Sequence, residues 1–370
     1  MDSNYKSFDF LNNFSQLLYF LNEYTDLQNL WMTSQNLWKS NERRVLRYLK
    51  LNVFKSREYL ESENFRRYIL SNVSNPIKQI SLNLSGCEEI TDVYKIMNVH
   101  NLNLSYCRRV IDISSLGNVH TLDLTKCDGI TDVSNLGNVH SLNLSSCGGI
   151  TDVSSLRNVH TLNLSYCLGI TDVSSLGNVH TLNLSYCLGV RDVSSLGNVH
   201  RLNLRGCREI SDVSSLGNVH TLDLSGCHRI TDVRNLGNVH ELNMIICNGI
   251  TDVSSLGNVH TLNLSFCTKI TDVSCLGNNH HLNLSYCYGI ADISSLGNVQ
   301  ILSLCYCSKI TDVSSLRNVH KLDITGCWRI PEVNNHLRNL NLVKFFCFIS
   351  MLSLISVVII IVSILYKFNF

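Results

Sequence analysis

Hydrophobic and polar positions along this chain repeat with a period of twenty residues. Residues 161–180 hold one copy, Thr-Leu-Asn-Leu-Ser-Tyr-Cys-Leu-Gly-Ile-Thr-Asp-Val-Ser-Ser-Leu-Gly-Asn-Val-His, and residues 181–200 differ from it at two positions. Twelve full copies fill residues 81–320, and a thirteenth, less regular copy begins at Lys321. A fixed period near twenty is typical of a solenoid, in which each copy forms one coil that stacks on the next.

Each copy contains one short stretch in which hydrophobic and polar residues alternate. In residues 161–180 this stretch is Leu162, Asn163 and Leu164, and it predicts a β-strand with one buried face. Strands of successive copies would pair in parallel, about 4.8 Å apart. Roughly five aliphatic side chains per coil would then be buried, contributing on the order of 10 kcal/mol before chain entropy is subtracted. Because only stacking keeps these side chains dry, no single copy is expected to fold alone.

The order of residue types within a copy resembles a known repeat family. The pattern Leu-x-x-Val-x-x-Leu-x-Leu-x-x-Cys-x-x-Ile-Thr-Asp-Val resembles the leucine-rich repeat in its cysteine-containing form. The run Ile-Thr-Asp-Val-Ser-Ser-Leu-x-Asn-Val is also similar to internalin-type repeats. The resemblance implies an α/β solenoid over residues 81–340, a horseshoe of about 13 coils with a parallel β-sheet on its concave face.

The segment before the repeats, residues 1–80, has hydrophobic residues at helical spacing and is predicted to form a helical cap. One helix is expected over residues 39–50, where Val45, Leu46 and Leu49 lie between charged residues. A further helical stretch is expected over about 55–71. Such a cap would shield the apolar edge of the first coil, as the end of every solenoid requires.

Part of this cap resembles an F-box, with an apolar helix, then Asp-Leu, then a short helix ending near a tryptophan. The opening Leu-Pro of that family is replaced here by Leu11-Asn12. The resemblance implies that the segment binds a Skp-type adaptor and that the repeats hold the substrate of a cullin-type ubiquitin ligase. The residues that would contact the adaptor are Leu17, Leu18, Leu21, Asp26, Leu27 and Leu30. The alternative is a cap that only covers the first coil.

Near the other end of the chain, residues 345–366 contain no charged side chain, and Lys344 and Lys367 flank them. These 22 residues are long enough to cross a bilayer as a helix. The run is apolar on all sides, which favours a transmembrane helix over a capping helix with one polar face. The N-terminus does not have the pattern of a signal peptide. We therefore expect a tail-anchored, single-pass membrane protein with its repeats in the cytosol.

The cysteines follow the repeat. Thirteen of the 16 recur every twenty residues from Cys87 to Cys327, which predicts a row of small buried side chains. Strand spacing would also allow disulfides, but a cytosolic location favours reduced thiols. The net charge of +1 gives no reason to expect nucleic acid as a partner.

Histidine, serine and aspartate also recur in each copy. Catalysis needs one distinct constellation, so these residues predict no enzyme, no cofactor and no small-molecule substrate. The histidines from His100 to His280, followed by Gln300 and His320, predict stacked rings about 5 Å apart. Metal binding by two such rings is the alternative. The aspartates from Asp92 to Asp312, with Glu332 last, predict a row of carboxylates that accept backbone N–H groups at a turn.

Departures from the repeat mark the candidate binding site, because the outward strand positions of a solenoid are its usual contact surface. In most copies these positions hold Thr, Asn, Ser and Tyr, and the departures cluster in copies seven to nine. Arginine and tyrosine are enriched at protein interfaces. The predicted protein-binding residues are Arg201, Arg205, Glu241 and Ile245, with the flanking aromatics Tyr166, Tyr186, Phe266, Tyr286 and Tyr306. Ile246 follows Ile245 in the same patch, and His228 and Arg229 lie between its charged positions.

These observations predict a membrane-anchored repeat protein that binds a protein partner, with ubiquitin-ligase substrate recruitment as the specialisation implied by the F-box-like head. An F-box-like head on near-identical, Asn- and Ile-rich repeats is also similar to proteins of large DNA viruses of amoebae. That similarity implies a host membrane for the anchor. The alternative is a structural or adhesive repeat protein without a ligase partner.

Overall fold

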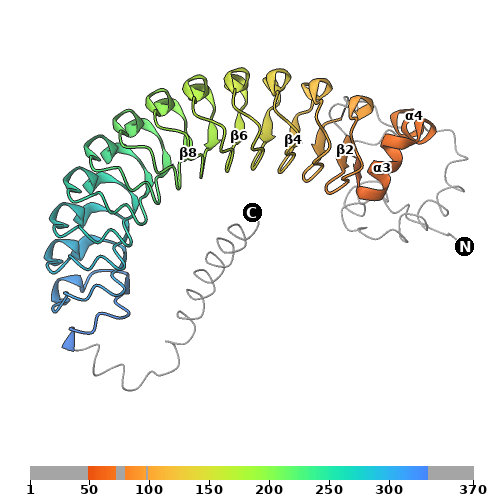
Figure 1. Ribbon diagram of the computed structural model, residues 1–370. Helices are drawn as coiled ribbons and strands as arrows, with labels where there is room; N and C mark the ends of the chain where they lie inside the picture. Colours follow the sequence, from red (N-terminus) through yellow and green to blue (C-terminus); the bar gives the residue numbers. More distant parts are fainter. Residues whose placement is uncertain (1–48, 72–79, 97–98, 332–370) are drawn as a thin grey trace, which may run out of the picture. The chain divides into compact units, whose positions relative to one another are not determined.

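The computed structural model of the protein describes residues 49–71, 80–96 and 99–331 (Figure 1). The six F-box-like residues between Leu17 and Leu30, Glu332 and the apolar segment 345–366 lie outside the described residues. No helix in the described ranges is both long and apolar enough to cross a membrane.

The strands of the described residues form one parallel sheet of 14 strands, arranged in the order in which they occur in the sequence. Each strand from β2 on is the short alternating stretch of one repeat, and in the pair β9–β10 Leu222 lies opposite Leu242, twenty residues later. The strands are β1 (Leu49–Leu51), β2 (Ile80–Asn83), β3 (Asn101–Asn103), β4 (Thr121–Asp123), β5 (Ser141–Asn143), β6 (Thr161–Asn163), β7 (Thr181–Asn183), β8 (Arg201–Asn203), β9 (Thr221–Asp223), β10 (Glu241–Asn243), β11 (Thr261–Asn263), β12 (His281–Asn283), β13 (Ile301–Ser303) and β14 (Lys321–Asp323). The predicted parallel solenoid is confirmed.

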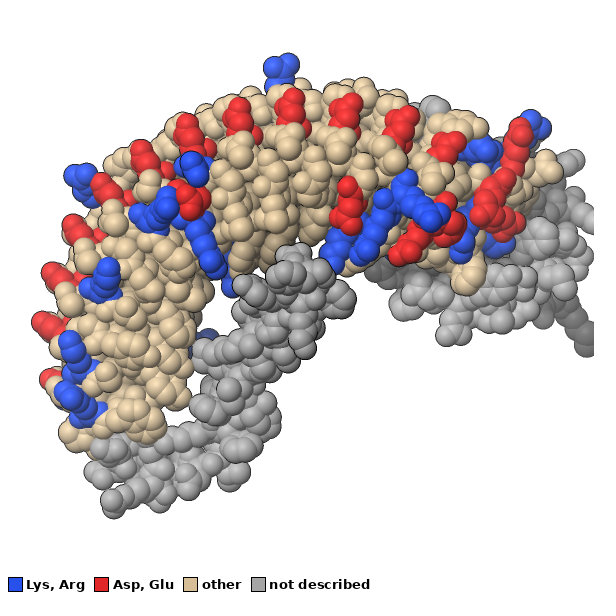
Figure 2. Space-filling model, in the orientation of Figure 1, with Lys and Arg blue, Asp and Glu red and all other residues tan. Residues whose placement is uncertain are grey.

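A short 3-10 helix follows each strand from β2 to β13, at the side of the coil away from the sheet (Figure 1). The recurring aspartate begins it as predicted: in one coil the N–H of Ser214 donates to Oδ1 of Asp212 at 2.9 Å. In each unit described below, Figure 2 shows these carboxylates as a red row along the 3-10 helices. The helices are η1 (Tyr94–Ile96), η2 (Ser114–Leu116), η3 (Ser134–Leu136), η4 (Ser154–Asn158), η5 (Ser174–Asn178), η6 (Ser194–Asn198), η7 (Ser214–Asn218), η8 (Arg234–Asn238), η9 (Ser254–Asn258), η10 (Ser274–Asn278), η11 (Ser294–Asn298) and η12 (Ser314–Leu316).

The chain divides into two compact units. The first runs to Ile170 and includes Asn178–Leu182, and the second takes in Thr171–Gly177 and continues from Asn183. The first unit contains the described part of the N-terminal cap, β1 with α3 (Val53–Glu61) and α4 (Glu63–Ser71). The second unit contains every predicted binding residue except Tyr166.

One expectation about the cap was wrong. The helix expected over 39–50 does not extend to residue 50, because Leu49–Leu51 form strand β1 and pair with β2. The helical stretch expected over about 55–71 is confirmed, and it consists of two helices, α3 and α4, separated by Ser62. The Ser62 N–H ends α3 by donating to the Glu58 carbonyl, and its hydroxyl accepts from the Phe65 N–H at the start of α4. One serine therefore caps both helices.

A buried serine connects α3 to the sheet. The hydroxyl of Ser56 donates to the Leu51 carbonyl at 3.2 Å and accepts from the Asn83 N–H at 2.9 Å. The side chain is fully buried, so these two bonds satisfy a polar group that would otherwise be costly inside the protein.

Each coil contributes one layer to a continuous core. Residues 221–240 bury six aliphatic side chains and one thiol, slightly more than the five aliphatic side chains expected. These are Leu222, Leu224, Cys227, Ile230, Val233, Leu236 and Val239, each at most 2% exposed. Because the same positions are buried in the coils on either side, the layers share one dry interior.

Candidate functional site

The predicted binding residues lie on the strand surface, which we define as the side chains at the first, third, fifth and sixth positions of each coil, counted from the first strand residue. Arg201, Arg205 and Glu241 are exposed there, and so is Tyr166, which belongs to the first unit. The other five predicted residues are half-buried: Tyr186, Ile245, Phe266, Tyr286 and Tyr306. The residues in the second unit form a charged part and an aromatic part.

The charged part is centred on strands β8 to β10. Arg201 and Glu241 both lie opposite Thr221 in the sheet register, so they point to the same side from strands two steps apart. The Thr221 hydroxyl donates to Oε2 of Glu241 at 3.4 Å. Arg201 and Glu241 lie two strand spacings apart, about 10 Å, and do not pair with each other among the ion pairs of the described residues. The Arg201 guanidinium therefore remains available to a partner, whereas Glu241 is bonded to Thr221.

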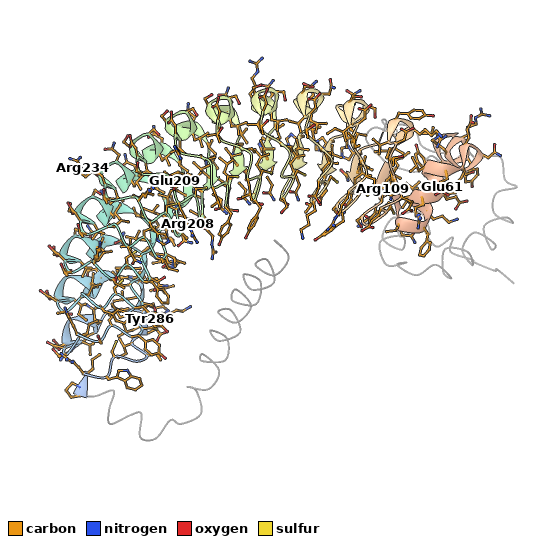
Figure 3. All side chains as sticks on the ribbon, viewed as in Figure 1. Glu61, Arg109, Arg208, Glu209, Arg234 and Tyr286 are labelled. Carbon is orange, nitrogen blue, oxygen red and sulfur yellow. The ribbon has the colours of Figure 1, made fainter. Side chains whose placement is uncertain are left out.

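The aromatic part is a stack of three rings. The centroids of Phe266 and Tyr286 are 4.3 Å apart, and those of Tyr286 and Tyr306 are 4.7 Å apart, with the rings nearly parallel. Figure 3 labels Tyr286 within this stack. Since each inner ring face already meets a neighbour, the stack presents mainly ring edges and phenol hydroxyls to a partner.

An unusual backbone conformation places these rings. All three residues have φ near +60°, a left-handed conformation that costs a residue with a side chain about 1 kcal/mol. Hydrogen bonds between coils maintain it: the N–H of Tyr286 donates to the Cys305 carbonyl of the next coil at 2.7 Å. The sixth position of the repeat therefore projects from the sheet at the same angle in each of these coils.

A second group of charged residues was identified only in part from the sequence, which indicated Arg229 but not Arg191, Arg208 or Glu209. Glu209 lies 2.8 Å from Arg229 and 3.8 Å from Arg191, measured between carboxylate oxygen and guanidinium nitrogen. Arg208, beside Glu209, is exposed (Figure 3). The available signal was position: Glu209 and Arg229 occupy the same place in consecutive copies, and stacking places such residues side by side.

The cysteine row is buried, as predicted. All thirteen of its members are buried free thiols. We expected a thiol to need no strong partner, but the structure gives most of them one: Sγ of Cys227, for example, donates to the Leu204 carbonyl of the preceding coil at 3.2 Å. Burial raises the pKa of Cys207 to about 12, so this thiol has almost no reactive thiolate at neutral pH.

We predict that a thiol reagent will label the row only after unfolding. Cys275 and Cys305 are half-exposed and Cys347 lies outside the described residues. A variant with serine at these three positions retains only the thirteen row thiols and should react negligibly in buffer but completely in guanidinium, as measured by absorbance of the released chromophore. Rapid labelling of most thiols in the folded variant would contradict the buried row.

The histidines form stacked rows, as predicted. In the first unit, rings from His100 to His180 are 4.5 to 4.7 Å apart between centroids. In the second unit, rings from His200 to His280 are 4.6 to 4.7 Å apart. Partial burial and then the rings of His100 and His140 lower the pKa of His120. No group of three or more His, Cys, Asp or Glu side chains arranged to hold a metal occurs among the described residues.

We predict that mild acid will destabilise the protein through these rows. Burial and neighbouring rings lower the pKa of His120 and His260 in the folded state, whereas in the unfolded chain a histidine pKa is about 6.5. The unfolded state therefore binds more protons below that pH, and stability falls as pH decreases through it. The melting temperature, measured by circular dichroism, should be lower at pH 5.5 than at pH 7.5.

Glutamine provides the control, because Gln300 occupies the histidine position in one natural coil. A variant carrying His120→Gln, His160→Gln, His220→Gln and His260→Gln should lose less of its melting temperature over the same pH range. The turn aspartates should not contribute to this pH dependence. Hydrogen bonds from Ser114 lower the pKa of Asp112, for example, so its carboxyl titrates well below pH 5.5. An equal loss in variant and wild type would contradict the role of the rows.

Comparisons with known proteins identify the fold. No family model matches the chain, and no curated protein sequence matches it. Among solved structures it is similar to an internalin, InlF of Listeria monocytogenes, at 22% identity and a TM-score of 0.52, covering 74% of this chain and 94% of that one. It is also similar to a leucine-rich repeat protein of Leptospira interrogans, at 15% identity and a TM-score of 0.50, covering 81% and 95%. The described part of the chain thus has the leucine-rich repeat fold predicted from its sequence.

Proposed function

We propose that this protein is a leucine-rich repeat scaffold that binds another protein through the strand surface of its second unit. One observation carries the proposal. The core positions of these coils remain apolar, while the departures from the repeat at Arg201, Arg205 and Glu241 are exposed. Side chains that differ from coil to coil on an otherwise uniform surface give that surface a specific region to recognise a partner.

The test is capture of binding partners from cell extract by the full-length, detergent-extracted protein. Arg205→Glu combined with Tyr286→Ala should abolish capture of a partner that the wild type retains. Arg234→Glu is the matched control, because Arg234 lies on η8, on the 3-10 side of its coil (Figure 3). Loss of the same partner with the control alone, or its retention by the double variant, would reject the strand surface as the binding site.

A ubiquitin-ligase role is the specific form of this function that the F-box-like residues support. In that form the segment from Leu17 to Leu30 binds a Skp-type adaptor while the strand surface holds the substrate. Purified adaptor should bind the full-length protein and not a variant with Leu17→Asp and Leu21→Asp. Equal adaptor binding by both proteins, or none by the wild type, would favour a structural or adhesive scaffold without a ligase partner.

Membrane anchoring is the third element of the proposal and is supported by the apolar segment 345–366. The full-length protein should remain in the membrane pellet after carbonate extraction, and a chain shortened before residue 345 should be released. Protease added to intact membranes should digest the repeats if they face the cytosol. Release of the full-length protein by carbonate would argue against a membrane-spanning helix.

A further inference from the structure

Exposed arginines lie on the strand surface of the second unit, and on the turns that directly follow its strands, between residues 185 and 249. The carboxylates beside them already have partners within the chain: Glu209 as described above, Asp223 with Ser225, and Glu241 with Thr221. The arginines are Arg191, Arg201, Arg205, Arg208 and Arg229, and all are exposed.

Three of these arginines have no acidic partner. Arg191 and Arg229 lie against Glu209, whereas Arg201, Arg205 and Arg208 form no ion pair with any residue that the structure describes. Figure 2 shows blue side chains gathered over this part of the second unit, on the strand side of the coils. Three exposed guanidinium groups without ion pairs on one coil are best complemented by carboxylates, which can accept two parallel hydrogen bonds from each.

An apolar notch lies within the same region, on the row formed by the sixth position of each coil. Glycine occupies this position at Gly206 and Gly226, with φ of +72° and +73°. The conformation does not require glycine, since Tyr186 and Ile246 adopt it with side chains, at +61° and +62°. The two glycines therefore leave space on the row.

Tyr186 fills the first of these two spaces, and the second is open. A Cβ atom on Gly206 would lie 2.6 Å from the Tyr186 ring, so the ring lies directly over that glycine. A Cβ atom on Gly226 would meet nothing nearer than backbone atoms of Gly206 at 3.9 Å. On the other side, Ile246 is 42% exposed. The notch thus has Gly226 as its floor, with Tyr186 and Ile246 on its two sides.

The width of this notch matches one flat side chain. Farther along the same row, Phe266, Tyr286 and Tyr306 stack at 4.3 and 4.7 Å. One missing side chain in a row with that spacing leaves room for one ring, stacked beside Tyr186 and packed on Ile246. Arg205 directly precedes Gly206, so a ring in the notch would bring its flanking residues close to the arginines.

We propose that this surface binds an acidic protein segment that inserts one aromatic side chain into the notch over Gly226 while its carboxylates pair with Arg201, Arg205 and Arg208. The inference rests on the proposed protein-binding function and specifies the chemistry of the partner. The arginines supply attraction and orientation, which salt weakens. The notch supplies the buried anchor that an interface needs near its centre.

Three synthetic peptides test the proposal on the full-length protein: Asp-Asp-Trp-Asp-Asp, Asp-Asp-Ala-Asp-Asp and Lys-Lys-Trp-Lys-Lys, all with blocked ends. The acidic tryptophan peptide should bind best in calorimetric titration, and loss of its ring should weaken binding about tenfold. The basic peptide should not bind measurably. Equal binding of all three peptides, or tighter binding of an oligothymidylate strand, would overturn the proposal.

Filling the notch provides the decisive variant. Gly226→Tyr places a ring where we expect the guest, at a position where tyrosine occurs naturally in other coils, and should weaken binding of the acidic tryptophan peptide about tenfold. The matched control is Gly86→Tyr, the same change at the same repeat position in the first unit, where nothing lies within 4 Å of the new Cβ. This control should bind like the wild type.

A second variant keeps the proposal testable even if Gly226→Tyr does not fold. The double variant Arg205→Gln with Arg208→Gln leaves the notch intact. It should weaken binding of the acidic tryptophan peptide and reduce the dependence of its Kd on salt. Unchanged binding in this variant, or in folded Gly226→Tyr, would overturn the proposal. If Arg205→Glu with Tyr286→Ala abolishes partner capture while the peptides fail to bind, the acidic aromatic partner is wrong and the scaffold function stands. If the peptides bind as expected and no protein is captured, the surface has the proposed chemistry, and the proposed function fails only for the partners present in that extract.

Discussion

Replacing Leu224 by alanine should lower the free energy of unfolding by about 3 kcal/mol. The side chain is fully buried, between the layers formed by the coils before and after it. Alanine would leave a cavity, and the coils on both sides are held in register by hydrogen bonds such as that from the Leu224 N–H to the Asn243 carbonyl, at 2.8 Å. The surroundings therefore cannot collapse easily into the space. Urea unfolding followed by far-ultraviolet circular dichroism measures the change.

Two controls separate the cavity from other effects of the substitution. Methionine occurs naturally at the same place in the next coil, where Met244 is fully buried, so Leu224→Met should cost less than about 1.5 kcal/mol. Leu168→Ala removes the same atoms from a side chain that is 58% exposed and should change stability by less than about 0.5 kcal/mol. A similar small effect for all three variants would contradict the shared core.

Replacing Asn279 by valine should raise the free energy of unfolding by about 1–2 kcal/mol. Asn279 occupies the position that holds valine in the neighbouring coils, and only 1% of it is exposed. Its Nδ2 donates to the carbonyls of Leu256 and Val259, but its Oδ1 is buried without a hydrogen-bond partner. Valine would remove that unsatisfied oxygen and add apolar contacts.

The reciprocal change tests the same cause in the opposite direction. Val239→Asn introduces the amide at an equivalent buried site in another coil and should cost about 1–3 kcal/mol. The urea midpoints of the two variants should therefore move to opposite sides of the wild type. A gain in stability for both, or a loss for both, would show that burial of the amide does not control stability at this position.

The rows of identical side chains were predictable because residues twenty positions apart become neighbours when the coils stack. Histidines twenty residues apart meet as rings, cysteines twenty residues apart share the interior, and Asp212 meets Ser214 within one turn. The predicted binding residues were likewise placed on the strand surface by their position in the copy. The exposure of Arg201 and Glu241, at the first strand position, follows from the alternation of the strand.

The features that escaped prediction depend on contacts between coils that differ from the repeat. Strand β1 forms because residues 49–51 pair with β2. The helical spacing of hydrophobic residues over 39–50 carries no information about this pairing with a distant segment. The contact of Arg191 with Glu209 joins different positions of neighbouring copies. The thiol bonds join residues 23 apart, one coil plus a local offset, which becomes visible only when the coils are stacked.

The sequence by itself determined the solenoid, the identity of each row and the apolar or polar character of each position, because a strict period of twenty allows every coil only one way to bury its aliphatic side chains. The tertiary structure decided how the sixth residue of each coil projects from the sheet. Its left-handed conformation is maintained by hydrogen bonds to the next coil, such as that from Gly226 N–H to the Ile245 carbonyl. For that reason the notch over Gly226, and the partner it suggests, emerged only from the stacked coils.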